Sequence, residues 1–200
     1  LQAPSMTDLS EHPRQALVER DTRAWLERAV IGLNLCPFAK AVYVKGQIHF
    51  VVSTAGDARA LLDDLARELR ALESIDPLVR STTLLIAPDC LADFYAFNDL
   101  LGRADKLLRR LELDGTLQIA SFHPRYQFAG TDPQDIGNFT NRAPYPTLHL
   151  LRESSIDQAV KAFPQAEQIF EQNICTLERL GREGWDDLDV GPSHDETPPR

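Results

Sequence analysis

Two leucine-rich helical patterns flank a short and almost entirely apolar run, and this alternation constrains the fold more than any other feature. The first pattern follows Asp57, a residue type that favours the N-cap of a helix, and the second covers residues 90–112. Between them, residues 81–88 (STTLLIAP) are short, β-rich and stopped by a proline, which predicts a buried strand. The apolar faces of the two helices are predicted to consist of Leu61, Leu62, Leu65, Leu69, Leu72, Phe94, Leu101, Leu108 and Leu111.

The rest of the chain continues the alternation of helices and strands, which is typical of a layered α/β domain. No helical crossover is evident between residues 122 and 146, so part of the sheet is expected to be antiparallel. We therefore predict an α/β fold, with α+β as the alternative, in which helices cover a mixed four-stranded sheet. The remaining predicted elements are helices at 14–34 and from Ile169 to about Gly181, and strands at 47–53, 116–122 and 146–152.

These elements predict a single domain over residues 14–182, between a flexible N-terminus and an acidic tail. Residues 183–200 contain six acidic residues and one arginine, which predicts a disordered tail. Residues 1–13 are expected to be flexible. Met6 is the only methionine, so residues 1–5 are expected to be a cloning remnant before the natural start.

Composition narrows the range of partners. A formal net charge of −9 disfavours binding to nucleic acids or to anionic membranes. No apolar run reaches the ~20 residues that cross a bilayer, and no secretion signal is evident. Three widely spaced cysteines (Cys36, Cys90 and Cys175) indicate no disulfide framework, which favours a reducing cytoplasm.

The segment 123–146 is the part of the sequence that most indicates a functional site. Loops longer than about 12–15 residues are usually functional or disordered. This one contains Tyr126, Phe128, Ile136, Phe139 and Tyr145, whose side chains favour burial, so we expect an ordered binding wall. Residues 121–152 carry three arginines and two aspartates in an otherwise acidic chain, which favours a small anionic ligand.

Two histidines flank this loop. His123 follows a predicted strand and precedes a proline, so it is predicted either to act as an acid/base or metal ligand or to anchor the loop through a carbonyl. His149 lies within the last strand between two leucines, an environment more typical of the core than of a ligand site.

Arg142 is the candidate anion-binding residue. The prolines that follow it stiffen the chain, and a guanidinium held in this way suits a carboxylate or phosphate. The alternative is that Arg142 caps loop carbonyls while the nearby asparagines form Asx turns. Asp135 is predicted either to orient a histidine or arginine or to cap the segment that follows it. The further candidates for ligand binding are Tyr126, Asn138, Asn141, His149 and Arg152.

Cys36 precedes a proline that favours the first turn of a helix, so we predict Cys36 as its N-cap. There the helix dipole and free amides would lower the pKa of the thiol, as a nucleophile, redox thiol or soft metal ligand requires. The alternative is a small buried apolar residue.

Three ordered blocks, NLCPFA (34–39), FHPRYQF (122–128) and DIGNFTNRAPYPTLHLLR (135–152), resemble a bacterial family with plant relatives known as domain of unknown function 1415. The resemblance covers roughly residues 20–182. It implies a free-standing cytoplasmic domain with these blocks as its signature, and it implies no reaction.

A shorter stretch, CPFAKAVYVKGQIHFVV (36–52), is similar to the start of omega-type glutathione transferases and glutaredoxins, in which Cys-Pro-Phe opens a helix after a strand. Here the preceding residues are predicted to be helical, and no second cysteine completes a CxxC motif. These differences count against kinship, and a thiol protein of that kind is kept only as an alternative.

The leading hypothesis is a small-molecule enzyme whose His/Arg/Asn site binds an anionic ligand. Cys36, His123 and Asp135 are its candidate catalytic residues. If Cys36, His123 and His149 converge, zinc or iron is the expected metal. The alternative from another class is a non-catalytic module that binds an anionic metabolite.

Overall fold

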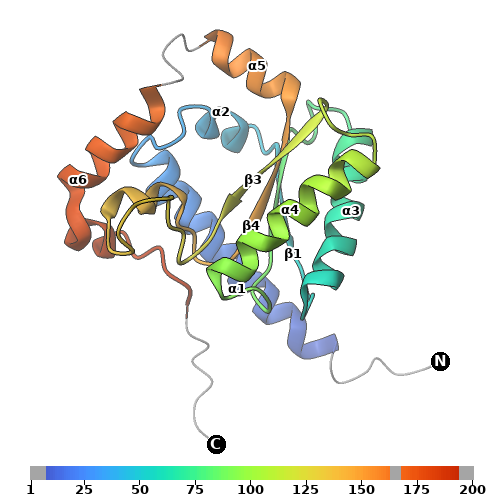
Figure 1. Ribbon diagram of the computed structural model, residues 1–200, viewed down its shortest axis with the longest axis horizontal. Coiled ribbons are helices and arrows are strands. Elements are labelled where there is room, and N and C mark those ends of the chain that lie inside the picture. Colours follow the sequence, from blue (N-terminus) through green and yellow to red (C-terminus); the bar gives the residue numbers. More distant parts are fainter. Residues whose placement is uncertain (1–7, 163–167, 194–200) are drawn as a thin grey trace, which may run out of the picture.

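The computed structural model describes residues 8–162 and 168–193 and forms one mixed four-stranded sheet covered by helices on both faces (Figure 1). This arrangement confirms the predicted α/β class and the mixed sheet. The strands are β1 (Ile48–Val52), β2 (Thr82–Ile86), β3 (Leu117–Phe122) and β4 (Thr147–Arg152). The helices are α1 (Asp8–Trp25), the π-helix η1 (Leu26–Ile31), α2 (Ala39–Val44), α3 (Ala58–Ser74), α4 (Phe94–Arg110), the 3-10 helix η2 (Ile136–Asn141), α5 (Glu153–Ala162) and α6 (Ile169–Asp187).

The strand order is β1-β2-β4-β3, and β4 is the strand that runs against its neighbours. β1 and β2 are parallel, whereas β4 is antiparallel to both β2 and β3. The register places His149 of β4 between Leu84 of β2 and Ala120 of β3. The long segment between β3 and β4 therefore connects two adjacent antiparallel strands, as the missing helical crossover predicted.

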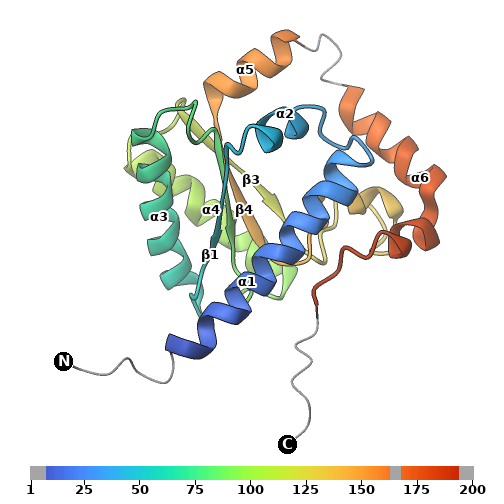
Figure 2. The same cartoon turned by 180° about the vertical axis from the view of Figure 1, so that it is seen from behind.

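Helices α3 and α4 cover one face of the sheet, and α1 crosses the other (Figures 1 and 2). Asp57 caps α3, since its carboxylate accepts hydrogen bonds from the backbone N–H groups of Arg59 and Ala60. The leucine stripe of α3 packs against Leu148 and Leu150 of β4 in a single core cluster. The buried face of α4 differs from the predicted one. Phe94, Leu101 and Leu111 are only partly buried, and the buried residues are Phe97, Leu100, Ala104, Leu107 and Leu108.

A second core lies between α1 and the opposite face of the sheet. It is built around Trp25, Phe50, Leu84 and Ile86, and the end of the chain joins it through Trp185. The face covered by α1 also holds α2 and α5 near its far end (Figure 2). Among the described residues, no helix combines the length and the apolar character that a membrane crossing requires.

Both ends of the ordered domain extend beyond the predicted boundaries. Helix α1 begins at Asp8, so residues 8–13 belong to a helix, while residues 1–7 lie outside the described part. At the other end, α6 continues to Asp187, and both Trp185 and Val190 are buried. Ser193 is held by Asp21 of α1, whose carboxylate accepts hydrogen bonds from its backbone N–H and its hydroxyl (2.8 and 2.7 Å).

The predicted acidic tail therefore starts too early, because apolar residues within it pack onto the domain. The portion from residue 194 onward lies outside the described residues. Two further local differences concern helices. Regular helix over 14–34 gives way to the π-helical turn η1, and α5 was not predicted at all.

Candidate functional site

The long segment after β3 is ordered around Asn138, which is fully buried. Its Oδ1 accepts hydrogen bonds from the backbone N–H of Phe128 (2.9 Å) and the hydroxyl of Thr131 (2.8 Å), and its Nδ2 donates to the carbonyl of Asp132 (2.8 Å). All of these bonds stay within the loop. Asn138 therefore acts as the centre of the loop, and both acceptor positions of its Oδ1 are occupied by loop groups.

Asp135 and Asn141 also have structural roles in this loop. The carboxylate of Asp135 caps η2 by accepting a hydrogen bond from the N–H of Gly137 (2.8 Å). This is the second of the two roles predicted for Asp135, the capping of the segment that follows it. The side chain of Asn141 donates a long bond to the carbonyl of Ser121 (3.4 Å). Tyr126 packs its ring against Phe94 and Phe128, with centroid separations of 5.2 and 5.0 Å.

His123 is fully buried beneath α4 and anchors the start of the loop. Its Nε2 donates to the carbonyl of Leu91 (3.0 Å), and its Nδ1 accepts the backbone N–H of Arg125 (3.0 Å). The rings of Phe94 and Phe97 lie 5.3 and 5.0 Å from the imidazole. Burial lowers the pKa of His123 below its usual value. With both nitrogens bonded to the backbone, the imidazole fits the anchoring role.

Arg142 lies at the end of η2 and faces an open pocket. Its Nε donates to the carbonyl of Tyr126 (3.2 Å), and one terminal nitrogen donates to the carbonyl of Pro133 (2.7 Å). The guanidinium lies 4.2 Å from the centroid of Phe139, and that of Arg182 lies 5.1 Å from the same centroid. Burial and the nearby charge of Arg182 lower the pKa of Arg142.

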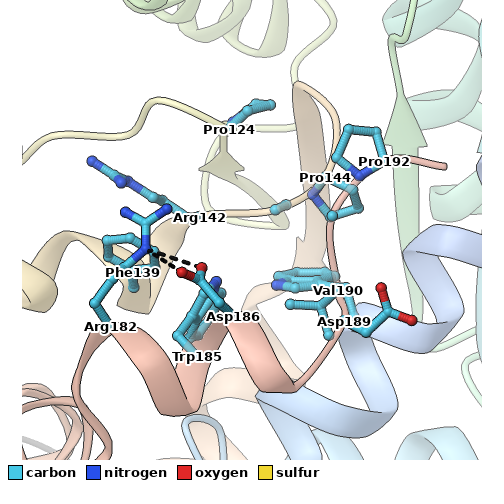
Figure 3. A pocket seen from close by; sticks show the side chains of 13 residues that line it. Pro124, Phe139, Arg142, Pro144, Arg182, Trp185, Asp186, Asp189, Val190 and Pro192 are labelled. Carbon is cyan, nitrogen blue, oxygen red and sulfur yellow. Dashed lines mark hydrogen bonds and ion pairs between the residues drawn. The ribbon is translucent and has the colours of Figure 1, made fainter. Parts of the chain in front are cut away.

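These two arginines line a hollow of about 350 Å³, which we call the arginine pocket (Figure 3). It lies where β3 ends and β4 begins, because Pro124 and Pro144 both line it. In open α/β sheets, ligands collect beyond the carboxyl ends of the strands. Within the described residues the lining is Trp25, Pro124, Phe139, Arg142, Ala143, Pro144, Arg182, Trp185, Asp186, Asp189, Val190, Gly191 and Pro192.

The charges of this pocket are unevenly compensated. Asp186 accepts two hydrogen bonds from Nε of Arg182 (3.0 and 3.1 Å), one turn apart on α6, as Figure 3 shows. Asp189 pairs with Arg28 outside the lining (3.4 Å). Arg142 has no carboxylate partner within residues 8–162 and 168–193. A ligand that enters the pocket would therefore meet the unpaired positive charge of Arg142.

The α6 half of the pocket was missed by the sequence analysis. The predicted helix ended near Gly181, and the acidic residues that follow were interpreted as a tail. In the structure Gly181 has a φ of 68° and kinks the helix, so the turn that carries Arg182, Trp185 and Asp186 packs onto η2. The spacing of Arg182 and Asp186 was an available signal, because an i,i+4 pair indicates that a helix continues.

Arg152 lies at the opposite end of β4 from the arginine pocket. It is buried, and one terminal nitrogen donates to the carbonyls of Leu72, Ile75 and Arg80 (2.6, 2.7 and 3.1 Å). The carbonyls of Leu72 and Ile75 belong to the C-terminal end of α3, where a positive charge is favourable, and that of Arg80 lies just before β2. Arg152 is therefore a structural residue, and it does not share a pocket with Arg142.

Cys36 and His149 share a second hollow, of about 320 Å³, which we call the apolar pocket. It lies between the sheet face covered by α1 and the helices α2 and α5, and its lining is almost entirely apolar. Nε2 of His149 lies 2.8 Å from the hydroxyl of Thr82, and burial lowers the pKa of His149 to about 4. The imidazole is therefore neutral at pH 7.

The predicted activation of Cys36 is wrong in its direction. Helix α2 begins at Ala39 with Phe38 as its N-cap, so Cys36 lies in the preceding turn. Backbone N–H groups of Phe38 and Ala39 do favour the thiolate, but burial is the larger effect, and the pKa of Cys36 is raised. The π-helix η1 precedes this turn, where glutaredoxin-like proteins have a strand.

The three candidate metal ligands do not converge. His123 packs against α4 on one side of the sheet, whereas Cys36 and His149 line a pocket on the other. Across the described residues, no group of three or more histidine, cysteine or acidic side chains is arranged to hold a metal ion. The predicted catalytic set is likewise divided, because neither His123 nor Asp135 lines either pocket.

The low pKa of His149 predicts a pH dependence of stability. In the unfolded chain His149 takes up a proton near pH 6.5, whereas in the folded protein it does so only near pH 4. The free energy of unfolding should therefore decrease as pH falls through this range. The full contribution is about 3 kcal/mol. In His149→Phe this decrease should be smaller by about 2 kcal/mol between pH 4.5 and 7, as measured by urea unfolding, because this range ends above the folded-state pKa. Equal slopes in the two proteins would contradict the burial of a neutral imidazole.

The mixed sheet, with helices on both faces and two hollows on one side of it, defines an α/β protein. Residues 17–187 match the family described as "Protein of unknown function (DUF1415)", and the chain belongs to that family. Neither a comparison with curated proteins nor one with solved structures finds a match.

Proposed function

We propose that this protein binds a small anionic molecule in the arginine pocket. The observation that carries the proposal is the state of Arg142, which is half-buried and has no carboxylate partner in the described part of the chain. A second guanidinium, from Arg182, lies over the same ring of Phe139. Bringing two cations together in a partly desolvated hollow costs free energy, and a bound anion would offset that cost.

The geometry of Arg142 suits a carboxylate or a phosphate. Two backbone carbonyls hold its Nε and one terminal nitrogen, so the planar group is fixed in orientation. Its other terminal nitrogen has no hydrogen-bond partner among the described residues. A guanidinium with a fixed orientation and a free N–H edge is typical of anion recognition.

The remainder of the lining favours an organic anion over an inorganic one. The rings of Phe139 and Trp185 pack edge to face, with centroids 5.0 Å apart, and three prolines complete the wall. Flat apolar surfaces of this kind contact the body of a ligand, while a few polar groups fix its orientation. We therefore propose an aromatic or similarly flat carboxylate or phosphate ester.

Binding without catalysis is the alternative that this pocket supports best. Its two aspartates are engaged in ion pairs, and Asp189 lies 94% exposed at the rim. A candidate acid or base would have to reach a reacting atom directly or through one water. The histidine and cysteine that were predicted to react lie elsewhere.

Phenyl phosphate is the probe for this proposal, and two substitutions on α6 should change its affinity in opposite directions. Arg182→Gln removes a cation and leaves Asp186 unpaired, so binding should weaken about tenfold, or about 1.4 kcal/mol. Asp186→Asn removes the competing carboxylate, so binding should tighten. Titration calorimetry at low salt measures both affinities.

Arg179→Gln is the matched control, because Arg179 lies on α6 but outside the pocket and bonds to the carbonyl of Cys175. Its affinity for phenyl phosphate should equal that of the wild type. Weaker binding in both Asp186→Asn and Arg179→Gln, or no change in Arg182→Gln, would refute the proposal. Consumption of a component of a metabolite pool, lost in Arg182→Gln, would show catalysis at the same pocket.

A further inference from the structure

The apolar pocket is a second site of different chemistry. The described residues that line it include no lysine, arginine, aspartate or glutamate. Its volume of about 320 Å³ lies at the lower end of the range for small-molecule sites, about 300–1,000 Å³. A charged molecule would lose its hydration there without gaining a counter-charge, so the lining favours an uncharged occupant.

Among the described residues, the imidazole of His149 presents a hydrogen-bonding atom without a partner in this pocket. The hydroxyl of Thr82 donates to the carbonyl of Leu150 (2.6 Å), so its contact with His149 requires the imidazole Nε2–H as the donor. The Nδ1 of the neutral ring is then an acceptor, and it has no hydrogen bond within the described residues. A ligand that donates a hydrogen bond to this atom would satisfy it.

The walls next to His149 are aromatic. The ring of Phe122 lies 5.9 Å from the imidazole at an interplanar angle of 34°, and Trp25 meets Phe122 edge to face at 5.1 Å. Both rings line the pocket. Aromatic walls favour flat ligands, because stacked and edge-to-face contacts add to the burial of apolar area.

We propose that the apolar pocket binds an uncharged aromatic molecule whose hydroxyl or ring N–H donates a hydrogen bond to Nδ1 of His149. This site is separate from the arginine pocket and does not depend on the function proposed there. It gives a role to two residues, Cys36 and His149, that the arginine pocket does not use.

Three related probes test the chemistry without any substitution. In calorimetric titrations 2-naphthol should bind. The compound 2-methoxynaphthalene, which lacks the donor, should bind about fivefold more weakly than 2-naphthol. The anion 2-naphthoate should bind no more tightly than the methoxy compound. His149→Phe should reduce the affinity for 2-naphthol to that of the methoxy compound. Equal affinities for all three probes would overturn the proposal.

Two identical substitutions on α2 test the place of binding. Val42→Trp fills the pocket, because Val42 lines it, and should abolish 2-naphthol binding. Val44→Trp changes a residue of the same helix that is 76% exposed and lies outside the lining, and it should bind as the wild type does. Binding that survives Val42→Trp would place the probe elsewhere.

Thiol alkylation gives an independent readout in the unmodified protein. Cys36 lines the pocket, whereas Cys175 is exposed on α6. Saturating 2-naphthol should slow the alkylation of Cys36 by iodoacetamide severalfold, as followed by peptide mass, and leave the rate at Cys175 unchanged. An unchanged rate at Cys36 would overturn the proposal even if Val42→Trp did not fold.

Discussion

Replacing Arg152 with leucine is expected to lower the free energy of unfolding by about 3 kcal/mol. The side chain donates hydrogen bonds to two backbone carbonyls at the end of α3 and to one just before β2, and leucine would leave them without that partner in a buried place. The loss of a cation from the C-terminal end of a helix adds to the effect. Urea unfolding measures the change.

The same variant separates a structural role for Arg152 from the predicted role in ligand binding. Because Arg152 lies at the far end of β4, phenyl phosphate should bind to the folded variant as it does to the wild type. Arg152→Lys retains the charge and should recover part of the lost stability. Unchanged stability combined with weaker phenyl phosphate binding would restore Arg152 as a ligand-binding residue.

Replacing Asn138 with alanine is expected to cost about 3 kcal/mol of stability and to weaken phenyl phosphate binding. Alanine removes three hydrogen bonds and leaves buried polar groups of the loop unsatisfied. Asn138 donates a hydrogen bond to the carbonyl of Asp132. The next residue is Pro133, whose carbonyl accepts a hydrogen bond from Arg142 and orients it. Hydrogen exchange of residues 126–141 and urea unfolding measure the two consequences.

Asn141→Ala is the matched control for this substitution. Within the described part of the chain its side chain makes a single bond of 3.4 Å, to the carbonyl of Ser121, so the loss should be below about 1 kcal/mol. If the two alanine variants had equal stability and equal exchange rates in the loop, Asn138 would not be its organising residue.

Periodicity was sufficient to predict the sheet and most of its helices. The leucine stripe after Asp57 and the run at 81–88 became α3 and β2, because each contains enough apolar side chains to determine which face is buried. Helix α4 shows the limit of this reasoning. Several apolar residues surround its axis, and contact with the sheet selected Phe97 and Leu100 over Phe94 and Leu101.

The sequence did not predict which groups each side chain contacts. Arg142 was predicted either to bind an anion or to cap loop carbonyls; it makes the carbonyl contacts, and it also lines a pocket. For His123 and Asp135 the structural alternatives describe the observed bonds. A pattern of residue types shows that a side chain can react or bind, whereas its neighbours in space determine whether its atoms are free.

The two pockets each combine segments that are distant in the sequence. Cys36 and His149 are separated by more than half of the chain, and they share a pocket because β4 lies in the middle of the sheet under α2. Arg182 joins Arg142 because Gly181 redirects α6. Both combinations depend on topology, which local periodicity does not specify.

Trp25, at the junction between α1 and η1, contributes to the walls of both pockets. A ligand that shifted the indole from one pocket would therefore also change the wall of the other. Any such influence must be mutual: the factor by which a naphthol alters the affinity for a phosphate ester equals the factor by which the ester alters the affinity for the naphthol.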